Sequence, residues 1–145
     1  MPSCVVDTNV LHHANRRIAN GQSAKLRKRI ALLTESVAGR VTLLISKALM
    51  NDYSQHLRPP FNDFVQAFWD AATRPAPNVR RNWRKLSGAE RDRARWTCRF
   101  PQHDLFLLRT AYGEESVIYS EEQALVATDG CIHKFFKVHV RDPSA

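Results

Sequence analysis

The chain has 145 residues, enough to bury a core as one domain, and its 43% hydrophobic and 25% charged residues are typical of a globular protein. No apolar run approaches the roughly 18 residues that a membrane span needs, and the first residues lack a secretory signal, so we expect a cytoplasmic protein without membrane contact. The 22 Lys and Arg against 14 Asp and Glu give a net charge of +8, which favours nucleic acid as a partner.

Strand and helix signals alternate along the chain. Short β-branched runs predict strands, and apolar residues spaced by three or four positions predict helices. In chain order we expect a strand at 3–6, a helical turn and polar loop to residue 22, a helix at 23–38, a strand at 41–46, helices at 47–57, 61–73 and 104–112, a strand at 116–120, a helix at 121–127 and a strand at 137–140. Ser46 is placed to cap the second of these helices, and Gly39 ends the first.

This alternation predicts an α/β fold with three layers, α/β/α, around a central parallel sheet of about four or five strands. We expect all residues, 1–145, to form a single domain. The three cysteines, Cys4, Cys98 and Cys131, are widely separated and include no CxxC pair. This spacing favours buried, reduced thiols over a disulfide framework or a zinc site.

A basic segment, residues 74–99, interrupts the alternation and forms an elaboration at about 74–101. It contains nine basic residues against two acids, and Trp83 and Trp96 lie among them. A solvated helical face would carry both signs of charge, whereas a one-sided cluster with aromatic residues fits phosphate contacts beside base stacking. We expect the nucleic-acid contacts to come from Arg80, Arg81, Arg84, Lys85, Arg91 and Arg95. In the rival interpretation the segment docks an acidic protein or packs within a homodimer.

Four acids fall where this fold would bring them together. Asp7 ends the first strand, Asp52 lies in the helix after the second, Asp104 begins a late helix, and Glu122 follows the strand at 116–120. The carboxyl ends of parallel strands meet at one crevice, where ligands bind. Each acid alone has an ordinary explanation as a cap or a solvated side chain, but their convergence favours a site.

Clustered carboxylates repel one another and raise one another's pKa values unless a cation is present, so the cluster implies Mg²⁺ or Mn²⁺. A metal-activated water held by such a cluster could hydrolyse phosphodiester bonds. The expected catalytic residues are Asp7, Asp52, Asp104 and Glu122, of which Asp7, Asp104 and Glu122 are the expected metal ligands. Asn9 and Ser120 are expected to orient the carboxylates. A zinc site at His12, His13 or His103 is not favoured, because no HxxxH motif or cysteine partner accompanies them.

These segments resemble the PIN domain nucleases, and the resemblance covers most of the chain. VVDTNVL is similar to the family's opening strand and D-x-N motif, ALMNDYSQHL to its leucine-rich acidic helix, DLFLLRTA to D-x-x-L-L-x-x-A, and VIYSEE to its last strand with Ser or Thr before an acid. Two positions depart from the family: Asp52 stands where Glu is usual, and Glu122 where Asp is usual.

The resemblance implies a metal-dependent endoribonuclease, with RNA favoured over DNA. It also implies a possible toxin of a prokaryotic toxin–antitoxin pair, neutralised by an antitoxin protein. The two departures favour an alternative, a catalytically weak or inactive PIN-like module that binds nucleic acid. A third hypothesis is a protein-interaction subunit whose basic segment binds an acidic partner.

Overall fold

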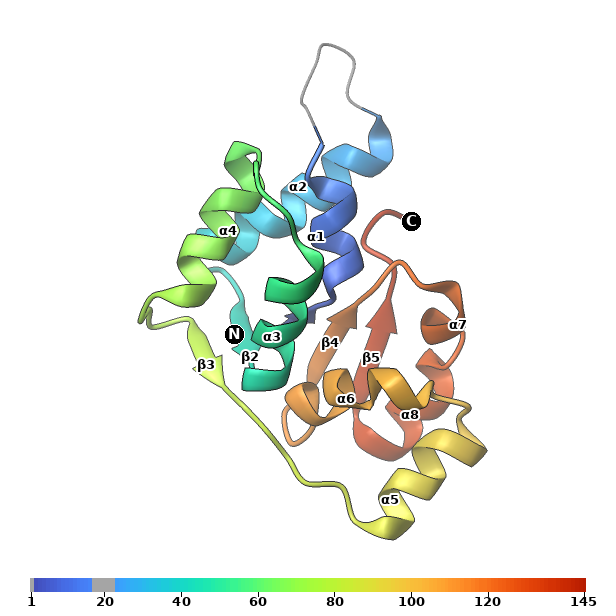
Figure 1. Ribbon diagram of the computed structural model, residues 1–145. Coiled ribbons are helices and arrows are strands. Elements are labelled where there is room, and N and C mark those ends of the chain that lie inside the picture. The colour runs from blue at the N-terminus through green and yellow to red at the C-terminus, as the bar shows by residue number, and fades with distance from the viewer. Residues whose placement is uncertain (1, 17–22) are drawn as a thin grey trace.

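The computed structural model describes residues 2–16 and 23–145 (Figure 1). Its centre is a five-stranded sheet in the order β3-β2-β1-β4-β5, in which every neighbouring pair is parallel. The strands are β1 (Ser3–Val6), β2 (Thr42–Ile45), β3 (Val79–Arg81), β4 (Ser116–Tyr119) and β5 (Val138–Arg141). All residues of β1 are buried, as in a sheet covered by helices on both faces. The predicted three-layer α/β/α class is confirmed.

The helices supply the crossovers that parallel strands require. They are α1 (Thr8–Ala14), α2 (Ala24–Val37), α3 (Lys47–His56), α4 (Asp63–Thr73), α5 (Gly88–Asp92), α6 (Leu105–Ala111), α7 (Gln123–Val126) and α8 (Asp129–Phe136). A π-helical turn (Arg93–Thr97) follows α5, and a 3₁₀ turn (Gln102–Asp104) precedes α6. The predicted elements match these within a few residues, and the expected polar loop lies largely outside the described residues.

The start of α3 is fixed by its cap. Ser46 accepts a hydrogen bond from the backbone N–H of Leu49 at 3.1 Å, which confirms its predicted role. Further along α3 the fully buried Tyr53 donates its hydroxyl hydrogen to the carbonyl of Val6, at the end of β1. The Tyr53 contact holds α3 against the carboxyl end of β1. Among the described residues, no helix is both long and apolar enough to cross a membrane.

Three parts of the structure were not predicted: β3, α8, and α5 with the π-helical turn that follows it. The edge strand β3 lies inside the basic segment, and two of its three residues are arginines, so it shows no apolar signal. The helix α8 buries Ile132 and Phe136 and ends at Lys137, whose φ of 60° lies in the left-handed region. Its eight residues follow α7 so closely that no turn signal separates the two helices.

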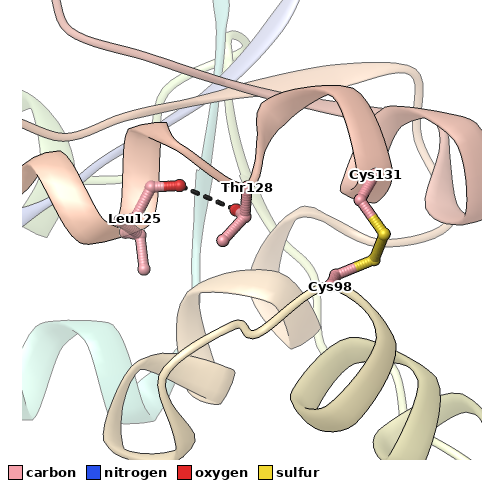
Figure 2. Close-up of a disulfide and its surroundings, with 4 residues drawn as sticks. All are labelled: Cys98, Leu125, Thr128 and Cys131. Carbon is pink, nitrogen blue, oxygen red and sulfur yellow. Dashed lines mark hydrogen bonds between the residues drawn. A yellow bond between two sulfur atoms is a disulfide. The ribbon is translucent and has the colours of Figure 1, made fainter.

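The expectation of three reduced thiols is wrong for two of them, because Cys98 and Cys131 form a disulfide (Figure 2). Cys98 follows the π-helical turn and Cys131 lies in α8, so the bond ties the end of the basic segment to the last helix. The two residues are 33 apart in sequence, and spacing alone could not reveal a Cα separation of 5.3 Å. Cys4 is a buried free thiol, as expected, and burial raises its pKa to about 12.

Candidate metal-binding active site

The sheet changes its direction of growth between β1 and β4. The chain adds β2 and then β3 on one side of β1, and later places β4 and β5 on the other side (Figure 1). At such a switch point the segments that leave the two central strands diverge, and a crevice opens at the carboxyl edge. Asp7 directly follows β1, and Ser120 directly follows β4, so both lie at this crevice.

Asp7 is buried and held on both sides. Its Oδ1 accepts the backbone N–H of Thr8 at 2.8 Å, and its Oδ2 accepts the hydroxyl of Ser120 at 2.9 Å. Burial, with smaller contributions from the nearby charges of Asp52 and Glu122, raises the pKa of Asp7 to about 6 against the effect of these hydrogen bonds. Asp7 therefore caps α1, as its ordinary explanation requires, and is also a member of an acidic cluster.

Asn9 and Ser120 connect the two sides of the crevice. Asn9 Nδ2 donates to Ser120 Oγ at 3.2 Å, and Asn9 Oδ1 accepts the backbone N–H of Glu121 at 3.1 Å. Ser120 Oγ also accepts the backbone N–H of Glu122 at 3.2 Å. Both side chains thus lie beside the acids they were predicted to orient, although the role itself stays a prediction.

Asp52 reaches the cluster from α3 through Thr8. The Thr8 hydroxyl donates to Asp52 Oδ2, while the backbone N–H of the same residue binds Asp7, so Thr8 joins two acids. One helical turn later, His56 Nε2 lies 3.5 Å from Asp52 Oδ1. Thr8 was missed because it fills the unspecified middle position of the D-x-N motif. Its place after the first acid was the only signal that the sequence offered.

Asp104 and Glu122 form the tightest part of the cluster. Ligand atoms of His103, Asp104 and Glu122 all lie within 4.8 Å of one another. Asp104 is buried, and its Oδ2 has no hydrogen-bond donor among the described residues, although His103 Nε2 lies 3.2 Å away. Burial and then the charge of Glu122 raise the pKa of Asp104 to about 7, with Asp7 adding to the shift and His103 opposing it.

Glu121, the neighbour of Glu122, serves a different purpose. Its carboxylate accepts hydrogen bonds from Arg29 Nε at 2.7 Å and Nη2 at 2.5 Å, and His13 Nδ1 lies 3.2 Å away. Burial raises the pKa of Glu121, but the hydrogen bonds and charge of Arg29 outweigh burial and lower it overall. Glu121 is thus committed to an ion pair with Arg29.

The donor set fits a hard divalent cation. Among the described residues, only His103, Asp104 and Glu122 bring ligand atoms within 4.8 Å of one another, and Asp7 and Asp52 lie outside this group. Asp7 is still near enough for its charge to raise the pKa of Asp104, and one buried oxygen of Asp104 lacks a donor, which a cation would satisfy. Carboxylate oxygens suit Mg²⁺ and Mn²⁺, while the exposed imidazole of His103 is a ligand for transition metals rather than Mg²⁺. The sequence did not favour His103 as a zinc ligand. Only its adjacency to Asp104 could have indicated that it lies beside the acids.

The predicted nucleic-acid residues differ in how far their charges are available. Arg80 is paired with Glu114 at 2.5 Å, and Arg95 lies 4.8 Å over the ring of Trp96. The remaining members, which are exposed and have no ion pair among the described residues, are Arg81, Arg84, Lys85 and Arg91. Trp83 and Trp96 are 46% and 70% exposed, so both can meet a partner.

No protein-family model matches the chain, and comparisons with curated proteins and with solved structures returned no match. The resemblance carried by the acidic motifs is therefore a proposal.

Proposed function

We propose that this chain is a PIN-like, metal-dependent nuclease that uses Mg²⁺ or Mn²⁺ and acts as an endoribonuclease. The observation that supports it best is the buried Asp104, whose Oδ2 has no hydrogen-bond donor among the described residues and whose carboxylate lies in one group with Glu122 and His103. A cluster of this kind destabilises the metal-free fold, and perturbed carboxylates gather at functional sites. The net charge of +8 adds long-range attraction for a polyanionic substrate.

The side chains of this site can be assigned roles from their contacts. Burial and the charge of Glu122 favour the protonated form of Asp104 when no cation is near, and Asp7 is held in place by Thr8 and Ser120. A bound divalent cation would supply Lewis acidity toward the scissile phosphate and neutralise this cluster. The hydrogen bonds to Asp7 fix its orientation before any ligand arrives, which lowers the cost of assembling the site.

Two parts of the proposal rest on the resemblance alone, RNA rather than DNA and an antitoxin partner. The cytoplasmic location was instead expected from the lack of a secretory signal and from the cysteine spacing. The cysteines no longer support the cytoplasm, because disulfides are rare there. A homodimer formed through the basic segment remains the alternative role for that segment.

Cleavage of a 5′-labelled single-stranded RNA with Mg²⁺, Mn²⁺ or EDTA tests the proposal, with the matching DNA as a second arm. We expect cleavage with either cation, none in EDTA, and none by Asp104→Asn. The control is Glu115→Gln, which removes an exposed acid just before β4, at the opposite end of that strand. Cleavage that persists in EDTA or in Asp104→Asn would rule out the metal-nuclease mechanism.

One observation favours a second candidate, a catalytically inactive module that binds nucleic acid. Asp52, which is shorter than the Glu usual at this position in PIN domains, accepts a hydrogen bond from Thr8 and lies beside His56. An acid with these partners is less available for chemistry. Tight binding of RNA without cleavage at any tested cation concentration would support this candidate.

A further inference from the structure

A second hollow lies at the same edge of the sheet as the acids. It has a volume of about 560 Å³ and is lined by residues from the first half of α3 and from the end of β3, among them Lys47, Asn51, Arg81, Asn82 and Trp83. Asn51 directly precedes Asp52 on α3. Because neighbouring strands are about 4.8 Å apart, the end of β3 lies about 10 Å from the end of β1, where Asp7 stands.

One wall of this pocket is an aromatic ring that the fold holds in place. Trp83 is 46% exposed, and Arg109 lies 3.9 Å over its ring centroid. Arg109 is itself fixed, because its Nε donates to the carbonyl of Arg84 at 3.0 Å. Asn82, the residue before Trp83, is anchored by two hydrogen bonds that its Nδ2 donates to carbonyl groups at the end of α6, at 2.8 and 2.9 Å. The indole is therefore a pre-positioned stacking surface.

The other walls carry available positive charge and amide groups. Lys47 and Arg81 are exposed, and neither has an ion-pair partner within the described ranges. Arg80, the neighbour of Arg81 on β3, is paired with Glu114 instead. Asn51 is exposed and can both donate and accept hydrogen bonds. Two cations, an amide and an aromatic ring in a pocket of this size are the groups that bind a nucleoside phosphate.

We infer that this pocket is a nucleotide subsite, which holds one base and its phosphate from a single-stranded nucleic acid next to the scissile bond. The base stacks on Trp83, and Lys47 and Arg81 contact the phosphate. The position next to a scissile bond rests on the proposed nuclease function. The binding itself does not, since it can be measured without any cleavage. The 2′-hydroxyl is the group that would distinguish RNA from DNA at this pocket.

The first test uses fluorescence anisotropy of a labelled uridine dodecamer and its deoxy counterpart, with EDTA present so that nothing is cleaved. Trp83→Leu should weaken binding about 10-fold or more, as expected for the loss of one stacked base. Trp83→Phe should retain most of the affinity. Trp96→Leu removes a second exposed tryptophan of the basic segment that does not line the pocket, so it should weaken binding less than Trp83→Leu does.

The second test measures the dependence of affinity on salt. Arg81→Ala and Lys47→Ala should each reduce the slope of log K against log salt by about 0.7, the value of one contact on a single strand. Arg80→Ala, which removes an arginine already paired with Glu114, should change the slope less than Arg81→Ala does. Equal slopes for Arg80→Ala and Arg81→Ala would overturn the subsite.

The remaining outcomes are equally decisive. Parent-like affinity in Trp83→Leu, or an equal loss in Trp96→Leu, would overturn the proposal. Parent-like oligonucleotide binding combined with loss of a dimer on a sizing column would make the pocket a protein interface and overturn it too. If the parent never cleaves but Trp83→Leu still loses affinity, the nuclease function fails while the subsite stands.

Discussion

Replacing Asp104 with Asn should stabilise the metal-free protein. The folded pKa of Asp104 is about 7, whereas an unperturbed Asp titrates near 3.9, so the folded chain retains a proton that the unfolded chain has lost. At about 1.4 kcal/mol per pKa unit the ionised carboxylate opposes folding by up to about 4 kcal/mol at pH 8. Solvent at the rim of the site and relaxation reduce this to about 2 kcal/mol, which is a rise in Tm of roughly 6 °C for a chain of this length.

The sign of the pH dependence follows from the same shift. Between about pH 4 and pH 7 the folded state binds more protons than the unfolded state, so this carboxyl group lowers stability as pH rises. The Asn side chain cannot ionise. The advantage of Asp104→Asn over the parent should therefore be near zero at pH 4, grow between pH 4 and 7, and stay constant above that range.

Differential scanning calorimetry in EDTA at several pH values measures this difference, with Glu115→Gln as the exposed control acid. Mg²⁺ or Mn²⁺ should raise the Tm of the parent and of the control but not that of Asp104→Asn. A lower Tm for Asp104→Asn at pH 8, or the same gain at every pH, would refute the reasoning that burial strains this carboxylate.

Three other substitutions have expected outcomes. Cys98→Ser opens a loop of 33-residue separation and should cost about 3 to 4 kcal/mol in urea unfolding, while parent-like midpoints would show that the disulfide does not stabilise the chain. Thr8→Val removes the hydroxyl that binds Asp52 and should slow cleavage at least about tenfold, whereas Thr8→Ser should restore it; equal rates in both would contradict the positioning role. Arg29→Ala leaves the carboxylate of Glu121 buried without its partner and should destabilise by about 3 kcal/mol, yet metal affinity measured by calorimetry should not change.

The positions of Asp7 and Glu122 could be predicted because both follow short apolar strands whose direction the alternation of elements determines. Predicting that Asp7 and Glu122 lie near each other required only a parallel sheet with β1 beside β4. The structure has that pairing, in which Ser3 lies opposite Ser116 and Val6 opposite Tyr119. The cap of α3 was likewise visible as Ser46 before a helical repeat. In each case a local signal and a general rule of sheet topology were enough.

Other features depend on contacts between distant residues and left no local signal. The partner of Cys98 is 33 positions away, and the pairing of Arg80 with Glu114 depends on where α6 ends. The pocket beside Trp83 forms only because β3, an arginine-rich strand without apolar alternation, lies next to β2. Charge counts along the chain could not separate Arg80 from Arg81, although the fold gives them different surroundings.

Calorimetric titration of Mn²⁺ into the metal-free protein near pH 6.5 tests the acidic site most directly. The account predicts saturable binding with release of protons, because carboxyl groups with pKa values of about 6 and 7 must ionise to bind a cation. Binding should persist in Glu115→Gln and be lost in Asp104→Asn. No saturable binding by the parent, or the same isotherm for Asp104→Asn, would contradict a metal site formed by these acids.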